Sequence, residues 1–363
     1  MKLPFSESFV VAMHMGTASE GVIINALWIL IPVTCWIVTL WIYGSIFIAQ
    51  HETLNRGGGG VAARRMVVLA LRAAIFVPVV ATLTLVSLFA PLLFDGLEVL
   101  SAVCEGYAIR CFFLLLVQNC GGLRGAVDHV RNGNGVPEFL QFASPRRGYV
   151  RICLMIWQFA WIRPCFSLSQ SVCNYVDSCG DGIWSLLSVG GALSCMIAMM
   201  CLTYFATCTW ETCRGLNVGW KFAVVKGAVA VVLTEAGILF FFSTSGVWTL
   251  GPSDLGLGTS YDTERERFIT LYCGVVLLEL AIIAFILDIA FAPTMVYSRA
   301  VMAGGDSKAD HAAPTRARLL YEVLDITDAA VGGDERLYHF GASRTDPEDA
   351  DEYDALVLSA DIT

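Results

Sequence analysis

The chain has 363 residues, of which 56% are hydrophobic and only 15% are charged. Soluble domains carry about a quarter charged residues, so this composition excludes an ordinary soluble enzyme. The net charge of −9 is concentrated at one end. The residues after Ser298 contain 6 Lys/Arg and 14 Asp/Glu, a net of −8, while the first 298 residues sum to −1. The acidity therefore belongs to a tail, and no basic block indicates nucleic-acid binding.

Seven apolar runs are long enough to cross a bilayer, where only structures that satisfy their own backbone hydrogen bonds are stable. They predict an all-α bundle of seven transmembrane helices, occupying residues 21–298 and joined between the second and third spans by a tight turn around Phe94–Gly96. The expected spans are 21–49, 67–93, 97–120, 150–174, 183–208, 222–243 and 268–293.

The distribution of Lys and Arg predicts the orientation of this bundle. The loops after the first, third and fifth spans carry ten Lys/Arg residues, whereas the N-terminus and the remaining loops carry only Lys2, Arg265 and Arg267. Basic loops stay on the cytosolic side. Residues 1–20 are therefore expected outside the cytosol, and the acidic tail inside it.

The tail divides into two parts. Within 299–343, apolar residues at helical spacing over 315–331 favour a short amphipathic helix, lying on the bilayer or against the bundle, or alternatively a loosely helical linker. Residues 344–363 are acidic and poor in apolar side chains, so we expect them to be disordered.

Two Tyr-x-x-Leu patterns occur in this tail, at Tyr321–Leu324 and Tyr353–Leu356. Such segments can add as a strand to a partner's sheet, which makes a sorting adaptor or a ubiquitin-like autophagy protein a candidate partner. The alternative is that Tyr321 and Leu324 simply belong to the amphipathic helix.

The fourth predicted span, 150–174, contains the most informative polar pattern. Arg163, Ser167, Gln170 and Asn174 fall on one helical face, and Pro164 removes a backbone donor beside them. A polar stripe cannot face lipid, so it predicts a water-filled or solute-binding cavity. The alternative is a buried ion pair, with Glu235 or Glu279 as its acid, that only fixes helix packing.

The remaining motifs mostly exclude functions. No zinc-spaced Cys/His set, nucleophile–base constellation or phosphate-binding glycine loop is present, so we expect no metal, no cofactor and no enzymatic or ATP-driven activity. A disulfide among Cys104, Cys173 and Cys179 is one alternative for the cysteines expected outside. Palmitoylation is a candidate modification of Cys208 and Cys213, which are expected next to the cytosolic face.

Several segments together resemble the organic solute transporter alpha family, which includes the proteins called transmembrane protein 184. The resemblance spans about residues 22–340. It rests on Glu105–Tyr107 with Gly121–Gly122, Gln158 with Arg163–Pro164, Lys221–Phe222 with Lys226, Glu279 with Phe291, and Leu324–Asp328. The sequence departs from the family at Glu235, Leu287 and Asp288, and these changes add acid to the expected cavity.

The resemblance implies a seven-helix membrane protein, in the plasma membrane or an endosomal or vacuolar membrane, that moves steroid-like amphipathic solutes with a single-pass partner subunit. We therefore expect a facilitative transporter. Arg163 would attract a polar or anionic head group, Ser167, Gln170 and Gln118 would hydrogen-bond it, and Glu235 and Glu279 would balance the buried cation. The alternative function is a non-transporting membrane scaffold that recruits proteins through its tail. A G-protein-coupled receptor is disfavoured, since neither an Asp-Arg-Tyr-like sequence nor Asn-Pro-x-x-Tyr is present.

Overall fold

The computed structural model describes residues 19–57, 61–132, 145–176, 181–213, 219–225, 227, 264–292 and 316–324. The described part is all helical, as predicted, and contains no strand. Its elements are α2 (Ser19–Gly57), α3 (Val61–Ala74), α4 (Phe76–Phe89), η1 (Pro91–Leu93), α5 (Phe94–Asn119), α6 (Leu123–Asn132), α7 (Pro145–Val176), α8 (Asp181–Cys208), α9 (Trp210–Cys213), α11 (Glu264–Ala290) and α13 (Arg316–Leu324).

Six stretches of the described helices are long and apolar enough to cross a membrane. Each overlaps one of the predicted spans: Ile29–Asn55, Ala63–Phe89, Pro91–Asn119, Gly148–Cys173, Val189–Cys208 and Tyr272–Ala290. The predicted sixth span, 222–243, lies outside the described residues apart from 222–225 and 227. The total of seven spans and the orientation therefore remain predictions.

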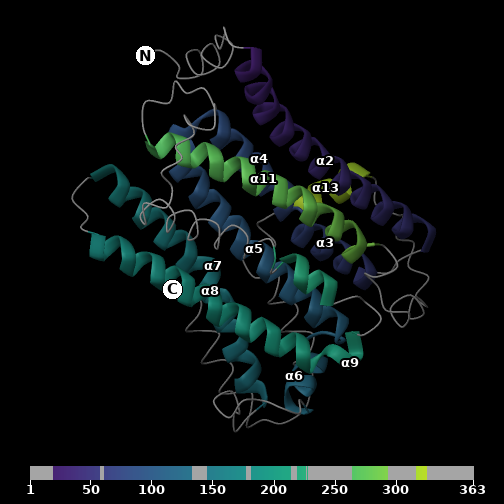
Figure 1. Ribbon diagram of the computed structural model, residues 1–363. Helices are drawn as coiled ribbons and strands as arrows, with labels where there is room; N and C mark the ends of the chain where they lie inside the picture. The colour runs from purple at the N-terminus through teal and green to yellow at the C-terminus, as the bar shows by residue number, and fades with distance from the viewer. Residues whose placement is uncertain are drawn as a thin grey trace.

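Helix α5 lies at the centre of the bundle (Figure 1). It packs against α3 and α4 on one side and against α7 on the other. Helix α11 packs against α2 and α4, and α8 packs against α7. The bundle thus consists of two groups of helices that meet at α5.

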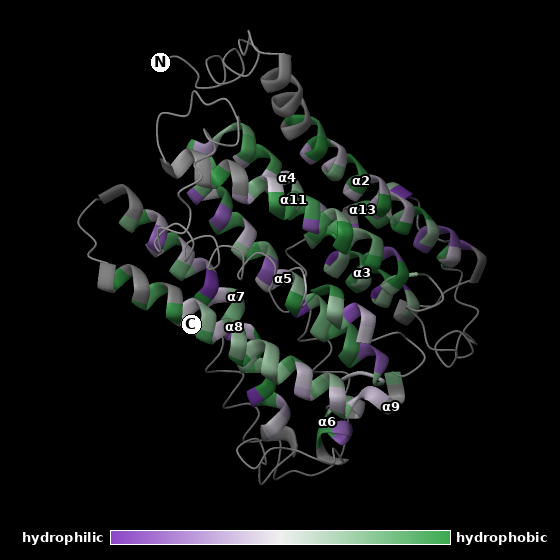
Figure 2. Cartoon of the chain, in the orientation of Figure 1, coloured by the Kyte–Doolittle hydropathy of each residue, from purple (hydrophilic) through white to green (hydrophobic). Residues whose placement is uncertain are grey.

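Many large apolar residues of the peripheral helices are exposed, and much of the ribbon of α2, α4 and α11 is hydrophobic (Figure 2). On α2, Trp41 is 69% exposed, and on α7, Trp161 is 68% exposed. Large apolar residues left open to solvent normally mark a surface that is covered by something apolar. In this bundle the exposed apolar residues lie on helices that are long enough to span a membrane, so these surfaces are suited to contact with lipid.

The second predicted span is broken into α3 and α4. Pro78 has no N–H to donate to the carbonyl of Ala74, where α3 ends. The turn into α5 also differs from the prediction around Phe94–Gly96. Ala90 leaves the helical conformation because it precedes Pro91, η1 follows, and Phe94 already begins α5.

Helix α5 ends at a Gly–Gly pair that the family resemblance had marked. Gly121 and Gly122 have φ values of 86° and 85°, a region that favours glycine. The Gly122 N–H donates to the Val117 carbonyl at 3.0 Å, which closes the helix end in a Schellman-type arrangement. The chain can then turn directly into α6.

The tail helix α13 lies against the bundle, which is one of the two placements expected for it. Leu319 and Val323 are buried, and α13 packs on α3. Arg72 donates from Nη2 to the Glu322 carbonyl at 2.6 Å, so it satisfies a carbonyl at the C-terminal turn of α13. Glu322 and Val323 of the first Tyr-x-x-Leu pattern are thus engaged in a helix, whereas Tyr353 and Leu356 lie outside the described residues.

Candidate functional site

The interface between α5 and α7 is antiparallel and carries several of the buried polar and charged groups of the described residues. Four pairs of residues define its register. Along the interface, Arg110 lies with its guanidinium 3.8 Å from the Trp157 ring centroid, Gly106 meets Ala160, Glu105 meets Arg163, and Ser171 Oγ donates to the Asp95 carbonyl at 3.2 Å.

Arg163 lies between two carboxylates of α5. Its Nη2 is 3.7 Å from Glu98 Oε1, and its Nε is 3.8 Å from Glu105 Oε2. Both distances exceed a hydrogen bond, and neither the Arg163 Nε nor the Glu105 oxygens have a hydrogen-bond partner. The three groups are therefore charge-paired but not hydrogen-bonded to one another at these atoms.

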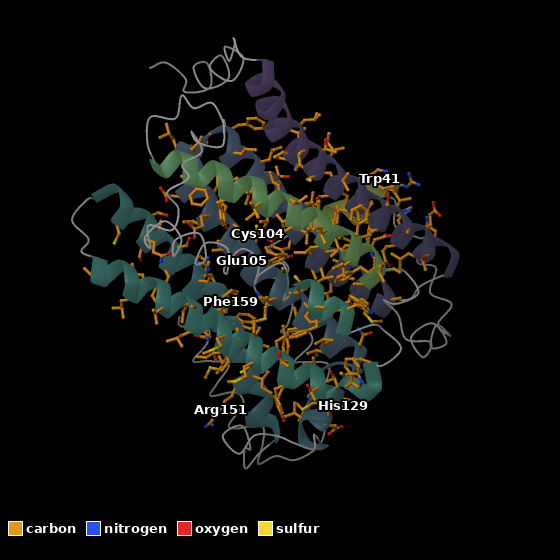
Figure 3. The ribbon with its side chains drawn as sticks, in the orientation of Figure 1. Trp41, Cys104, Glu105, His129, Arg151 and Phe159 are labelled. Carbon is orange, nitrogen blue, oxygen red and sulfur yellow. The ribbon has the colours of Figure 1, made fainter. Side chains whose placement is uncertain are left out.

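Arg163 and Glu105 are buried, whereas Glu98 is partly exposed. The Arg163 side chain is 9% exposed and that of Glu105 is 1% exposed, whereas that of Glu98 is 33% exposed. Figure 3 shows Glu105 and Phe159 in the middle of the bundle, while Trp41 lies on its outer side and Arg151 and His129 lie near one end. Of these three groups, Glu98 is therefore the one that reaches the surface of the described structure.

Small residues let the helices approach one another beside the cluster. A Cβ on Gly106 would lie 2.6 Å from the Ala160 Cα and 3.4 Å from the Ala160 carbonyl oxygen. That carbonyl is also the one that Pro164 deprives of its usual donor. A Cβ on Gly190 of α8 would lie 2.8 Å from the Phe166 ring, and Gly191 faces Arg163 Nη1. Gly190 and Gly191 therefore serve close helix packing.

Unpartnered polar atoms gather at the same interface. In the described residues, buried side-chain atoms without a hydrogen bond include the Oγ atoms of Ser101, Ser167 and Ser194 and both Glu105 oxygens. Each such group in a hydrocarbon environment costs several kcal/mol unless something satisfies it. Ser101 and Ser167 lie within a helical turn of Glu105 and Arg163, which makes this the part of the described structure best suited to a polar guest.

The predicted site residues are only partly brought together. Ser167 is buried beside Arg163 on the same face of α7, and Gln170 is half-buried one turn further. Gln118 is 13 residues from Glu105 along α5, about 20 Å away. Glu279 is on α11, which packs against α2 and α4, and Glu235 lies outside the described residues.

The acids paired with Arg163 are therefore not the expected ones among the described residues. Glu98 and Glu105 of α5 take the place proposed for Glu279. Ser171, eight residues after Arg163, also shares the buried face and extends it to Asp95. The helical spacing of Ser171 from Arg163 is visible in the sequence. The pairing of Glu98 and Glu105 with Arg163 is not, because it depends on the register between two helices.

A second cluster lies where α5 and α9 end. Cys120 and Cys213 are hydrogen-bonded to each other, and Lys221 lies beside Cys213. Burial lowers the pKa of Lys221 to about 7. The hydrogen bond from Cys120, together with Lys221, lowers the pKa of Cys213. Cys213 has no exposed surface, whereas Cys208 is half-buried, so Cys208 is the more accessible of the two predicted palmitoylation sites.

Of the cysteines expected outside the cytosol, Cys173 is disulfide-bonded and Cys104 carries a free thiol. Cys179 lies outside the described residues. Cys173 is near the C-terminal end of α7, at the opposite end of that helix from Arg151.

Comparison with known proteins identifies the family. The family described as organic solute transporter Ostalpha matches residues 63–297, which covers α3 to α11 and the whole α5–α7 interface. No curated protein and no solved structure matches the chain. Because the match extends over more than half of the sequence, the chain belongs to the organic solute transporter alpha family of multi-pass membrane proteins.

Proposed function

We propose that this protein is a facilitative transporter of an amphipathic organic solute with an anionic head group, and that the α5–α7 interface binds that head group. The observation that carries the proposal is the set of unpartnered polar atoms around Arg163. A bundle surrounded by lipid gains nothing from leaving serine hydroxyls and a carboxylate unsatisfied. A polar guest that passes through the interface would satisfy them in turn.

In this proposal Arg163 is the head-group residue. A guanidinium binds carboxylates and sulfates through paired N–H donors, and here it already holds two carboxylates at 3.7 and 3.8 Å. A solute anion would replace one of them. Ser167 and Gln170 lie on the same helix within reach of the head group, whereas Gln118 and Glu279 lie elsewhere, so we leave those two out of the proposed site.

The steroid-like class of solute comes from the family resemblance, and the apolar lining of the helices fits the body of such a molecule. Cys173 supports the proposed orientation, because disulfides form in oxidising compartments and this one is at the end of α7 remote from the basic loops. The tail-scaffold alternative gains no support, because Glu322 and Val323 of its first motif are engaged with α3.

Reconstitution tests the proposal. The full-length protein, purified with any chains that remain associated, is placed in liposomes, and uptake of a tritiated steroid sulfate is followed. We expect saturable uptake by the wild type, its loss in Arg163→Ala, and its retention in Arg151→Ala, an exposed arginine of the same helix. Wild-type uptake no faster than that of empty liposomes, or full uptake by folded Arg163→Ala, would refute the proposal.

A further inference from the structure

The apolar stripe of α13 is wider than the bundle covers. Leu319 and Val323 are buried against the bundle. Leu320 and Leu324, which lie next to them around the helix, are 43% and 55% exposed. Arg316 is also exposed and begins the row that Leu320 and Leu324 continue at every fourth residue. A helix that served only to pack on α3 would carry polar residues in this outer row, so the row is suited to apolar surroundings.

The contacts of Glu322 fix the depth of α13 in the membrane. Arg64 donates to its carboxylate and Arg72 to its carbonyl. These arginines are eight residues apart, about 12 Å along α3, so the C-terminal turn of α13 lies between their levels. The apolar stretch Ala63–Phe89 begins beside Arg64, and its 27 residues exceed the roughly 20 that the hydrocarbon core needs. Helix α13 therefore lies where lipid head groups meet acyl chains.

Helices α3 and α13 together carry five arginines and one glutamate, a net charge of +4. The arginines are Arg64, Arg65, Arg72, Arg316 and Arg318, and the glutamate is Glu322. The predicted orientation places this end of the bundle at the cytosolic leaflet, whose anionic lipids attract basic segments beside them. The charge of the two helices is therefore complementary to that leaflet.

Arg316 occupies an unusual place in its helix. It is the first residue of α13, whose first turn contains no acid. The N-terminal end of a helix carries a partial positive charge, so a cation there opposes the helix dipole. A phosphate beside Arg316 would offset both charges, and a guanidinium presents paired N–H donors to such a group.

We propose that Arg316, Leu320 and Leu324 form a docking surface for an anionic phospholipid of the adjoining leaflet. The two leucines contact the upper part of the acyl chains, and Arg316 binds the head-group phosphate. Helix α13 is then held by α3 on one side and by lipid on the other. This surface is separate from the α5–α7 interface, and α13 lies beyond residues 63–297 that match the family, so the inference does not depend on the proposed function.

The size of the surface favours a lipid over a protein partner. Two leucines that are 43% and 55% exposed offer far less than the about 800 Å² that each partner buries in a stable protein complex. A lipid needs no such area, because the rest of its acyl chains remains in the bilayer.

Deuterium exchange of the full-length protein in nanodiscs tests this docking. One preparation contains phosphatidylcholine alone, and the other contains equal parts of phosphatidylcholine and phosphatidylserine. We expect the amides of Arg316–Leu324 to exchange about fivefold more slowly with phosphatidylserine, the effect of one arginine beside anionic lipid. Arg316→Ala should lose this difference, and Arg316→Lys should keep most of it. The control Arg151→Ala, an exposed arginine of α7, should behave as the wild type.

The leucines are tested in the same nanodiscs. The double variant Leu320→Ser, Leu324→Ser should exchange faster over α13 in both preparations. Leu168→Ser is the control, because Leu168 of α7 is as exposed as Leu324, at 55%. Equal wild-type exchange in the two preparations would overturn the inference. Two further outcomes would also overturn it: protection by soluble glycerol phosphate in phosphatidylcholine nanodiscs, which indicates a free anion, and protection in detergent that rises with protein concentration, which indicates a second copy.

Discussion

Arg64 of α3 and Glu322 of α13 form a two-pronged ion pair across 258 positions of the chain, with Arg64 Nε donating to Glu322 Oε2 at 2.8 Å. Together with the bonds from Arg72 to the Glu322 carbonyl, this pair fixes the tail helix to the bundle. The two side chains are about one-quarter exposed, so the ion pair alone contributes only about 0.5–1 kcal/mol.

Reversing the charge of Arg64 should loosen α13. In Arg64→Glu, like charges would face each other, and the amides of Arg316–Leu324 should exchange with deuterium faster than in the wild type. The double variant Arg64→Glu, Glu322→Arg should restore slow exchange. The control is Arg65→Glu, because Arg65 is the exposed neighbour of Arg64. Equal exchange in Arg64→Glu and Arg65→Glu would contradict the role given to the pair.

A methyl group at Gly106 should destabilise the bundle. The added Cβ would meet the Ala160 Cα at 2.6 Å, and overpacking of this kind costs about 1–3 kcal/mol. We expect Gly106→Ala to lower the melting temperature in detergent. Gly44→Ala on α2, where nothing lies within 4 Å, should leave it unchanged or raise it, since alanine favours the helix by about 0.5–1 kcal/mol. Equal melting temperatures would show that the α5–α7 contact is less tight than described.

The turn after α5 should be sensitive to the type of residue at Gly122. Its φ of 85° costs an L-residue with a Cβ roughly 1–2 kcal/mol, and asparagine tolerates this region better than alanine. Unfolding should therefore be easiest for Gly122→Ala and intermediate for Gly122→Asn. Chemical denaturation of the three proteins measures the order, and an alanine variant as stable as the wild type would contradict it.

Lys221 should make stability depend on pH. Burial lowers its pKa from 10.5 in the unfolded chain to about 7 in the folded protein. Between these values the unfolded state binds more protons, so stability should rise as the pH increases from about 7 towards 10.5, by at most about 1.4 kcal/mol per unit. The cost of charging the buried amine is fully present below pH 7.

Replacing this amine removes the effect. Lys221→Met should melt at a temperature that varies less with pH over that range, whereas Lys308→Met, a lysine of the tail segment, should behave as the wild type. A wild-type melting temperature that falls as the pH rises would show that other groups dominate.

Much of this architecture follows from the sequence, because lipid imposes one constraint on every span. The apolar runs located the six described spans, and the helical spacing of Arg163 and Ser167 identified the buried face of α7. The break at α3–α4 and the turn at η1 differ from the predicted spans, because Pro78 and Pro91 interrupt the helix within an apolar run that hydropathy alone does not divide.

The acids at Arg163 could not be predicted in the same way. In the sequence, Glu105 is notable only as part of the family resemblance, and no pattern distinguishes Glu98. Their pairing with Arg163 depends on the register of α5 against α7, which is fixed by the Gly106–Ala160 contact. A single sequence contains the periodicity of each helix but not the offset between two of them.

That same contact limits how the interface can move. With Gly106 of α5 against Ala160 of α7, the two helices touch almost backbone to backbone at one level, one residue beyond Glu105. A change in the tilt of one helix against the other would therefore pivot at this contact, where the two backbones are closest. Widening on the side of Glu98 and Ser171 would then narrow the side of Arg110 and Trp157, and the reverse tilt would exchange the two.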